Sequence, residues 1–305
     1  MDNANVGNIT FKIKECAMWQ IPFYMLEKEN TMLKEMMNAV NEKAPLVHCI
    51  TNYVTVNDCA NAVLAIKASP IMADDEAEVE EITSICNALV INIGTLNQRT
   101  IQSMIKAGKK ANALGHPVIL DPVGAGASSL RTNTALTLLK EVKFSIIRGN
   151  SSEIKTLALG SGTTKGVDVD IQDVVTKENA EDTIRFAKAF SKQTGAIMAI
   201  TGALDIIASE EKAYVLYNGC KEMSSITGTG CMLSAMCGAY AAANINNMVD
   251  AAACIVAMMG ISGELAYEKV CKTNGGTGSM RTFIIDALSN MTPSVLEERI
   301  KYELR

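Results

Sequence analysis

Residues 88–124 read ALVINIGTLNQRTIQSMIKAGKKANALGHPVILDPVG, and this stretch indicates the fold. The apolar runs at 88–95 and 117–124 are short and bounded by glycines, which is typical of buried strands. Between them, residues 98–115 predict a helix closed by Gly115, because glycine readily adopts the left-handed conformation of a helix C-terminus. Strand, helix and strand in this order predict that the two strands pair in parallel.

The same alternation extends along most of the chain. Residues 205–219 predict a hairpin that turns at Glu210-Glu211, and mostly helix follows it. Repeated strand–helix units predict an α/β fold with a mainly parallel central sheet and helices on both faces. Strands are predicted at 45–52, 144–150 and 196–202, with a short strand or loop at 69–74, and helices at 30–43, 55–67, 76–87, 131–142, 151–159 and 179–194.

Composition argues against several classes of protein. Apolar residues make up 48% of the 305 residues and aromatic residues 5%, which favours close helix–sheet packing over a β-sandwich. The net charge is −5 and charges of both signs are well mixed, so no basic stripe predicts a nucleic-acid partner. The apolar stretch at 231–263 is interrupted by polar residues, which predicts two buried helices and no membrane span.

Cysteine and histidine usage predicts a cytoplasmic protein. The nine cysteines form no C-x-x-C pair and most lie in apolar runs, which is typical of reduced, buried thiols. His48 and His116 are the only histidines, too few for a histidine-rich zinc site and little material for a Ser-His-Asp triad. The N-terminal segment lacks the basic and apolar regions of a signal peptide.

Polar residues or glycines follow four of the predicted strands. They are Asn52, Asp121, Arg148-Gly149-Asn150 and Thr201-Gly202. The carboxyl ends of parallel strands share one edge of a sheet, where ligands bind, so we expect these groups to converge. Ordinary strands also end in polar turns, and a single such residue would carry no functional meaning. Acidic, basic and hydroxyl groups together favour a site.

Two of these segments allow both a structural and a functional interpretation. In DPVGAGAS, Asp121 could hold Mg²⁺ through water while the glycines let the backbone approach a phosphate, or the segment is an ordinary turn. In RGNSSE, Asn150 and Glu153 have the spacing of a capping box that starts a helix. The functional alternative gives Glu153 a metal-linked role and Arg148 a phosphate contact.

SITGTGCMLSAMCG (225–238) is the sharpest motif. If a helix begins near Gly230, its free N–H groups favour an anion. The same field predicts a pKa of the Cys231 thiol below its usual value of ~8.5. The alternative is a glycine-rich turn followed by a core cysteine. GSGTTKG (160–166) lacks the Gly-Lys-Ser/Thr order of a phosphate-binding P-loop and follows a helix.

Taken together, these motifs resemble the hydroxyethylthiazole kinase family, in that family's order and spacing, from about residue 32 to the C-terminus. The combination of RGN-x-x-E, DPVGAGA and TG-x-GC makes the resemblance specific. The matching segments are HCITNYVTVNDCAN (48–61), ASPIMAD (68–74), NIGTL (92–96), ILDPVGAGAS (119–128), IRGNSSEI (147–154), AITG (199–202) and TGTGCMLSA (227–235).

The resemblance implies a ribokinase-like α/β fold and a kinase reaction. Members of the family transfer the γ-phosphate of ATP to the hydroxyl of 4-methyl-5-(2-hydroxyethyl)thiazole, with Mg²⁺, for thiamine synthesis and salvage. It also implies a homotrimer with active sites between subunits. Residues 32–305 would form one kinase domain, while residues 1–31 lie outside the family pattern as an extension that we expect to be poorly ordered.

The resemblance also gives roles to residues that match the family's motifs. Cys231 stands where most ribokinase-like enzymes carry a catalytic aspartate. Because phosphoryl transfer asks little of a base, we expect Cys231 to orient the hydroxyl and to assist without being indispensable. By the same resemblance Met72, Asn52 and Gly228 would contact the substrate, Arg148 and Thr201 would contact ATP, and Asp121 and Glu153 would serve Mg²⁺ and the phosphates.

The sequence departs from the family pattern at one further position, and three other functions are compatible with parts of it. Lys67 stands where the family usually has glycine, which often allows a positive φ that lysine adopts only at some energetic cost, so the resemblance leaves the local backbone beside Met72 open. The nearest alternative is a hydroxymethylpyrimidine kinase of the same superfamily, which Cys231 argues against. A thiol enzyme with Cys231 as nucleophile would need a base close by. A non-catalytic sensor of a vitamin precursor need not keep Asp121, Arg148 and Glu153.

Overall fold

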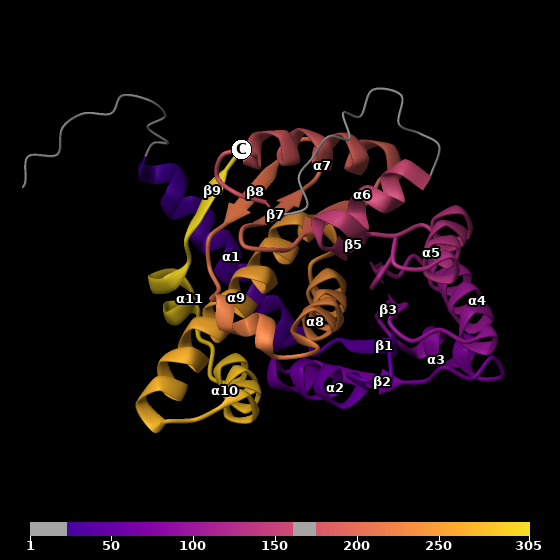
Figure 1. The fold of residues 1–305 in the computed structure, drawn as a ribbon, viewed down its shortest axis with the longest axis horizontal. Coiled ribbons are helices and arrows are strands. Elements are labelled where there is room, and N and C mark those ends of the chain that lie inside the picture. Colours follow the sequence, from indigo (N-terminus) through magenta and orange to yellow (C-terminus); the bar gives the residue numbers. More distant parts are fainter. Residues whose placement is uncertain (1–22, 161–174) are drawn as a thin grey trace, which may run out of the picture.

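The computed structural model describes residues 23–160 and 175–305, which form one nine-stranded sheet with helices on both faces (Figure 1). The strands are β1 (Leu46–Ile50), β2 (Ser69–Met72), β3 (Ala88–Asn92), β4 (Val118–Asp121), β5 (Ile146–Gly149), β6 (Ile197–Ile200), β7 (Asp205–Ala208), β8 (Ala213–Leu216) and β9 (Tyr302–Leu304). Their order in the sheet is β2-β1-β3-β4-β5-β6-β7-β8-β9. All pairs from β2 to β6 are parallel, which confirms the mainly parallel sheet predicted from the sequence.

The antiparallel end of the sheet contains the expected hairpin and one unexpected strand. β7 and β8 are joined by a tight turn, in which the Ser209 N–H donates to the Lys212 carbonyl at 2.9 Å. β9 pairs antiparallel with β8, although the sequence after the hairpin predicts mostly helix. A strand of three residues is too short to show a periodicity, so pairing with a neighbour decides its structure.

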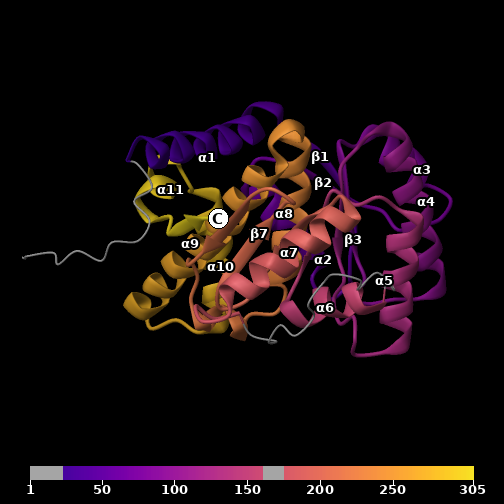
Figure 2. The same ribbon diagram turned by 90° about the horizontal axis from the view of Figure 1, so that it is seen from above.

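Two sets of helices cover opposite faces of the sheet, as Figure 2 shows for α1 and α4. Each set buries its apolar side in a separate core cluster. The first face carries α1 (Phe23–Lys43), α2 (Val56–Ala65), α8 (Thr229–Ala243), α9 (Met248–Thr273), α10 (Thr277–Ser289) and α11 (Pro293–Arg299). The second carries α3 (Val79–Ile85), α4 (Gln98–Leu114), α5 (Ser129–Glu141), α6 (Ser151–Gly160) and α7 (Ala180–Thr194).

The ends of two helices bear on the sequence predictions. Gly115 closes α4 with φ +73°, and its N–H donates to the Ala111 and Asn112 carbonyls, so the predicted C-cap is confirmed. α1 begins at Phe23, earlier than the helix predicted at 30–43. Residues 1–22 of the proposed extension, and nearly all of the GSGTTKG segment, lie outside the described residues.

The apolar stretch at 231–263 forms the two buried helices that the sequence predicts. α8 and α9 pack against each other and against the sheet in the first core cluster. Among the described residues, the helical segment Ile245–Thr273 is long and apolar enough to cross a membrane by length and composition. Its most apolar window is 78% buried inside the protein, as in the core helix of a globular fold.

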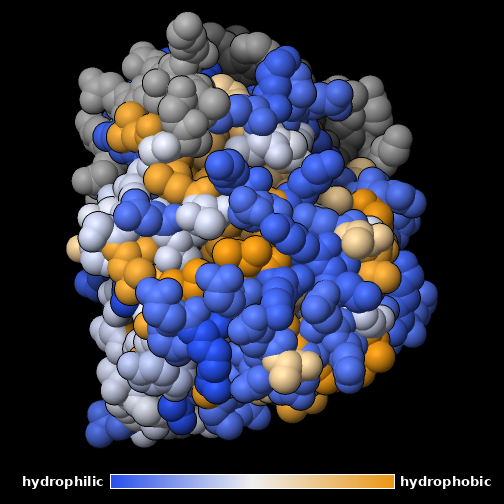
Figure 3. All heavy atoms as spheres, turned by 90° about the vertical axis from the view of Figure 1, so that its right-hand side faces the viewer, coloured by the Kyte–Doolittle hydropathy of each residue, from blue (hydrophilic) through white to orange (hydrophobic). Residues whose placement is uncertain are grey.

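The outer face of α3, α4 and α5 is mainly hydrophilic, with small apolar patches scattered over it (Figure 3). α4 keeps Ala107 and Ala111 fully buried against the sheet, while Leu114 at its end is exposed. This separation of apolar and polar sides is what a helix covering a sheet needs.

Lys67, which follows α2 and precedes β2, has a φ of +64°, so lysine adopts here the conformation that glycine allows more readily. We expect Lys67→Gly to raise the free energy of unfolding by up to about 1 kcal/mol, because glycine adopts this conformation without strain. Lys110→Gly, in the middle of α4, is the matched control and should lower it by about 1 kcal/mol. Urea unfolding measures both, and equal destabilisation by the two substitutions would contradict the prediction.

Candidate active site

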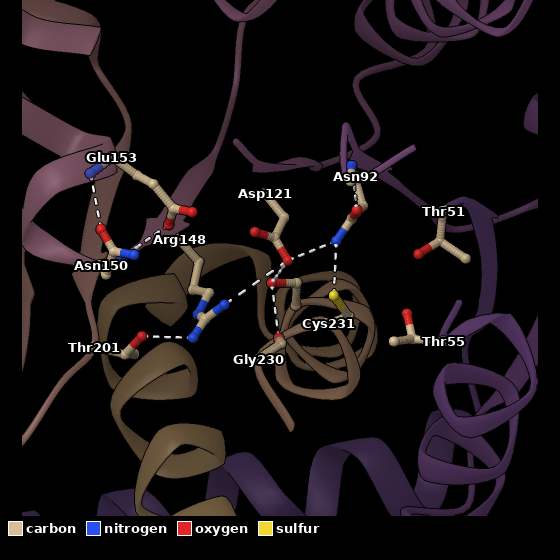
Figure 4. A network of polar contacts seen from close by, with 12 residues as sticks. Thr51, Thr55, Asn92, Asp121, Arg148, Asn150, Glu153, Thr201, Gly230 and Cys231 are labelled. Carbon is tan, nitrogen blue, oxygen red and sulfur yellow. Dashed lines mark hydrogen bonds and ion pairs between the residues drawn. The ribbon is translucent and has the colours of Figure 1, made fainter. Parts of the chain in front are cut away.

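Five adjacent strands present polar side chains at one edge of the sheet. β1, β3, β4, β5 and β6 are neighbours, so their carboxyl ends form a row. The residues at or just beyond these ends, in the order of the row, are Asn52, Asn92, Asp121, Arg148 and Thr201, of which the last four are labelled in Figure 4. The strand-end residues singled out in the sequence therefore lie together.

The N-terminus of α8 points into this row of side chains. Gly228 is the N-cap residue with φ +90°, a left-handed conformation that favours glycine. The first helical hydrogen bond runs from the Met232 N–H to the Gly228 carbonyl at 2.8 Å. The amides of Thr229, Gly230 and Cys231 precede it and carry the partial positive charge of a helix N-terminus.

Arg148 lies directly against the first turn of α8. A Cβ atom added to Gly230 would stand 2.4 Å from Nη1 of Arg148, so only glycine lets the guanidinium come this close. Nη2 of Arg148 donates to Oγ1 of Thr201 at 2.5 Å (Figure 4). Nε of Arg148 is buried and has no hydrogen-bond partner among the described residues. Two sources of positive charge thus meet at one point, which favours an anion.

Asp121 is the carboxylate that faces this positive charge. Its Oδ2 accepts hydrogen bonds from Nδ2 of Asn92 and Oγ of Ser234, both at 2.7 Å, and lies 3.8 Å from Nη1 of Arg148. Its Oδ1 is buried with no partner among the described residues. Burial raises the pKa of Asp121 to about 6, against the opposing effects of Arg148 and the two donors.

Glu153 forms the capping box predicted from its spacing. The Glu153 N–H donates to Oδ1 of Asn150 at 2.8 Å, and Oε2 of Glu153 accepts from the Asn150 N–H at 2.9 Å. Oε1 of Glu153 accepts from the Gly124 N–H at 2.8 Å. Glu153 therefore ties the loop after β4 to the start of α6, and its metal-linked role stays a prediction.

Cys231 contacts two asparagine side chains. Its sulfur accepts from Nδ2 of Asn52 at 3.2 Å and from Nδ2 of Asn92 at 3.3 Å. Burial raises the pKa of the Cys231 thiol, and the charge of Asp121 raises it further, although these hydrogen bonds act in the opposite direction. The lowered pKa predicted from the helix N-terminus is wrong, because burial and a nearby carboxylate outweigh the helix field.

A cavity of about 680 Å³ opens at this edge of the sheet. One part is polar and charged, and the other is apolar and lies between α8 and α9. Besides Asp121, Arg148, Glu153, Thr201, Gly228 and Cys231, its lining includes Asn150, Asp205, Leu233, Val256 and Met259.

Two predicted substrate residues, Asn52 and Met72, are not among the residues that line the cavity. Asn52 lies behind Cys231, as its hydrogen bond to the sulfur shows. Met72 ends the edge strand β2, beside Cys49, and is half-buried.

The C-terminal segment supports one wall of the cavity at Asn218. The Lys301 N–H donates to Oδ1 of Asn218 at 2.8 Å, and Nδ2 of Asn218 donates to the Arg299 carbonyl at 2.9 Å. Asn218 lines the cavity. The segment that leads into β9 therefore fixes residues far from it in the sequence.

Sequence reasoning missed Asn92 and Ser234. Asn92 ends the apolar run ALVIN, so the rule that singled out Asp121 applies to it equally. Ser234 lies one helical turn after Gly230 and has no such signal, because a serine in an alanine-rich helix is ordinary. Its contact with Asp121 depends on how α8 packs against β4.

Neither histidine lines the cavity. His48 is fully buried, with Nδ1 at 2.9 Å from Oγ1 of Thr83 and Nε2 at 2.8 Å from the Ala73 carbonyl oxygen. A thiol enzyme would need a base beside Cys231, and the described part of the cavity offers no histidine for that role.

Alkylation tests the environment of Cys231. We expect iodoacetamide at neutral pH to modify Cys271, which is exposed, at least about tenfold faster than Cys231, because the thiolate is the reactive form and burial disfavours it. Mass spectrometry of tryptic peptides follows both sites, with Cys231→Ser as the control for peptide assignment. Faster modification of Cys231 than of Cys271 would support the thiol enzyme.

Comparisons with known proteins agree on one family. The model of the hydroxyethylthiazole kinase family matches residues 37–294. The hydroxyethylthiazole kinase of Clostridium acetobutylicum is 61% identical over 272 residues, which cover 89% of this chain and 99% of the relative. The solved hydroxyethylthiazole kinase protein from Pyrococcus horikoshii OT3 is 34% identical with a TM-score of 0.81, covering 90% of this chain and 99% of that one.

More distant structures share the fold alone. The pyridoxal kinase of Staphylococcus aureus solved with AMP-PCP and pyridoxal is 15% identical, with a TM-score of 0.53 over 72% of this chain and 87% of that one. The expected ribokinase-like fold is thereby confirmed. The family model and relatives that match over nearly their full length show that this chain is a kinase and belongs to the hydroxyethylthiazole kinase family.

Proposed function

We propose that this kinase transfers the γ-phosphate of ATP to the hydroxyl of 4-methyl-5-(2-hydroxyethyl)thiazole, forming the phosphate ester used in thiamine synthesis and salvage. Its relatives are named for this substrate. The observation that carries the proposal is the Arg148 guanidinium against the first turn of α8, in the cavity that also holds Asp121 and Cys231. These groups supply the charge stabilisation that phosphoryl transfer needs.

The transferred group would lie at the start of α8. In the loose transition state of phosphoryl transfer, negative charge spreads over the equatorial oxygens. The amides of Thr229, Gly230 and Cys231 and the guanidinium of Arg148 are already aimed at this point. Donors held in place before the reaction need no reorganisation during it, so they lower the barrier more than water can.

ATP would span the two parts of the cavity. Its phosphates would contact Arg148 and Thr201, as the family resemblance implies, while its base would lie in the apolar part against Val256 and Met259. Apolar burial of the base and charged contacts to the phosphates are the usual division in a nucleotide site. This orientation directs the γ-phosphate toward Cys231.

Asp121 fits a Mg²⁺ ion that arrives with ATP. Its Oδ1 is buried and has no partner among the described residues, and Mg²⁺ takes one or two carboxylates and completes its shell with phosphates and water. Within residues 23–160 and 175–305 there is no group of three or more His, Cys, Asp and Glu that could hold a metal ion. When bound, the ion would neutralise phosphate charge.

Glu153 would act on the metal indirectly. Both of its carboxylate oxygens accept backbone N–H groups, from Gly124 and Asn150, in the structure. It would therefore hold the loop that follows Asp121 and add negative charge near the ion. This role agrees with the effect of the Glu153 charge, which raises the pKa of Asp121.

Cys231 would orient the acceptor hydroxyl. Its raised pKa keeps the thiol neutral at physiological pH, and a neutral thiol is a poor base. The thiol would therefore position the hydroxyl for attack, while the proton leaves late in the reaction. This role makes Cys231 helpful but dispensable.

The thiazole side of the site would be completed by a second subunit. Tyr53 and Val54, next to Asn52, are 80% and 59% exposed. Met72 ends the edge strand β2, which pairs with β1, the strand that precedes them in the chain. Exposed apolar side chains beside a site indicate a contact surface, because their burial against a partner stabilises the assembly. This supports a homotrimer with active sites between subunits.

The single domain over residues 32–305 and the cytoplasmic location also belong to this proposal.

An ATPase assay with defined acceptors tests the function. ADP should form only when the thiazole alcohol and Mg²⁺ are both present. We expect Asp121→Asn to lower kcat by at least about 100-fold, because a neutral amide would hold less firmly the cation that stabilises the negative transition-state charge. Cys231→Ser should lower kcat only roughly tenfold, which is less than the loss of a general base causes.

Two outcomes would count against this assignment. Faster turnover of a hydroxymethylpyrimidine acceptor would favour the alternative kinase of the same superfamily. Cys231→Ser protein with intact affinity for ATP and thiazole but no detectable turnover would show that the thiol is indispensable.

The pH profile reports the ionisation of Asp121. Its carboxylate must be ionised to hold a metal, and burial raises its pKa to about 6. We therefore expect kcat/KM for MgATP to be level above pH 6 and to fall about tenfold per pH unit below it. Ser234→Ala removes a donor that lowers this pKa, so the acidic limb should move to higher pH. An acidic limb that stays in place would contradict the assignment.

A further inference from the structure

Asn92 is buried behind the cavity and contacts two groups of the proposed reaction. It ends β3, is 1% exposed and is not among the residues that line the cavity. Its Nδ2 donates to Oδ2 of Asp121 at 2.7 Å and to Sγ of Cys231 at 3.3 Å (Figure 4). The roles implied by the family resemblance do not include this residue.

The orientation of the Asn92 amide follows from its neighbours. Its Oδ1 lies 2.9 Å from the Gly94 N–H and 3.0 Å from Nδ2 of Asn52. A backbone N–H only donates, so this end of the amide must be the carbonyl oxygen. The NH₂ group must then face Asp121 and Cys231, and the reversed amide would place its oxygen against a carboxylate.

Asn52 is oriented in the same way. Its Oδ1 accepts from the N–H and the hydroxyl of Thr55, both at 3.1 Å. Its Nδ2 donates to Oδ1 of Asn92 and, at 3.2 Å, to Sγ of Cys231. The sulfur therefore receives one N–H from each asparagine, and each NH₂ group uses both of its hydrogens.

These donors restrict the Cys231 side chain. Neither asparagine can accept the thiol proton, because both present N–H groups to the sulfur. The S–H bond must therefore turn away from them, toward the cavity or the hydroxyl of Thr55, which also contacts the sulfur. A cysteine side chain rotates about a single bond, so two donors at the sulfur select one rotamer.

We propose that Asn92 is a positioning residue of the phosphoryl transfer, whose amide fixes the Cys231 sulfur beside the Asp121 carboxylate. The inference rests on the proposed function and identifies a residue outside the cavity that sets the geometry within it. Asn92 acts through the sulfur and not by touching the substrate. Ser234 also donates a hydrogen bond to Asp121. Among the described side-chain amides, only Asn92 and Asn52 donate to the Cys231 sulfur.

A double-mutant cycle separates these two contacts. At pH 8, Asn92→Ala should lower kcat about tenfold in the native background and about threefold in a Cys231→Ala background, with KM values for both substrates changed less than about threefold. Ser234→Ala is the matched control, because it removes the other donor to the same Asp121 oxygen without contacting the sulfur. Ser234→Ala should lower kcat about threefold in both backgrounds. Equal losses for Asn92→Ala in both backgrounds would overturn the inference.

Crystal structures of the substrate-free variants give a readout that needs no activity. In Asn92→Ala, the Cys231 sulfur should occupy a second rotamer, while Ser234→Ala should keep a single one. A single, unmoved sulfur in Asn92→Ala would overturn the inference whatever the kinetics. If Asn92→Ala does not fold, Asn92→Ser serves for the same comparison. If the native protein does not phosphorylate the thiazole alcohol, the proposed function fails, and the sulfur rotamer still decides the positioning role.

Discussion

The site depends on one carboxylate, Asp121, which holds two sources of positive charge together. The guanidinium of Arg148 lies against the N-terminus of α8, and the two would repel each other without a negative charge beside them. Asp121 is in range of both, through its ion pair with Arg148 and its hydrogen bond from Ser234 on α8. It thereby joins β4, β5 and α8 at one point. Gly230 makes the arrangement possible, since any side chain there would displace the guanidinium.

This arrangement is tuned for a ligand and not for the stability of the free protein. Within residues 23–160 and 175–305, neither Oδ1 of Asp121 nor Nε of Arg148 has a hydrogen-bond partner, and each such buried group costs free energy until something binds it. An incoming phosphate and its cation would satisfy both. Unpaired polar groups inside an otherwise well-packed protein are expected where function takes precedence over folding.

The fold could be predicted from the sequence because its signals are local. Apolar runs such as 88–92, and caps such as Gly115, specify their own elements, and parallel βα units leave little choice of topology. β9 could not be predicted, because its structure depends on pairing with β8, a strand distant in the sequence. The same holds for Ser234, whose contact with Asp121 depends on helix packing. The prediction for the pKa of Cys231 is wrong because the helix start is visible in the local sequence, whereas the carboxylate of Asp121 and the packing around the thiol come from distant parts of the chain.

The pairing of β9 with β8 has a consequence for the order in which the structure forms. The backbone of Arg305 exchanges hydrogen bonds with Ala213, and Lys301 binds Asn218 in the cavity wall. Contacts between segments close in sequence form faster than contacts between distant ones, so the parallel strands can pair before β9 joins the sheet. The wall at Asn218 would then form late in folding, because one of its supports comes from the segment that leads into β9. A folding intermediate without this contact would have the parallel sheet in place and one side of the cavity unsupported.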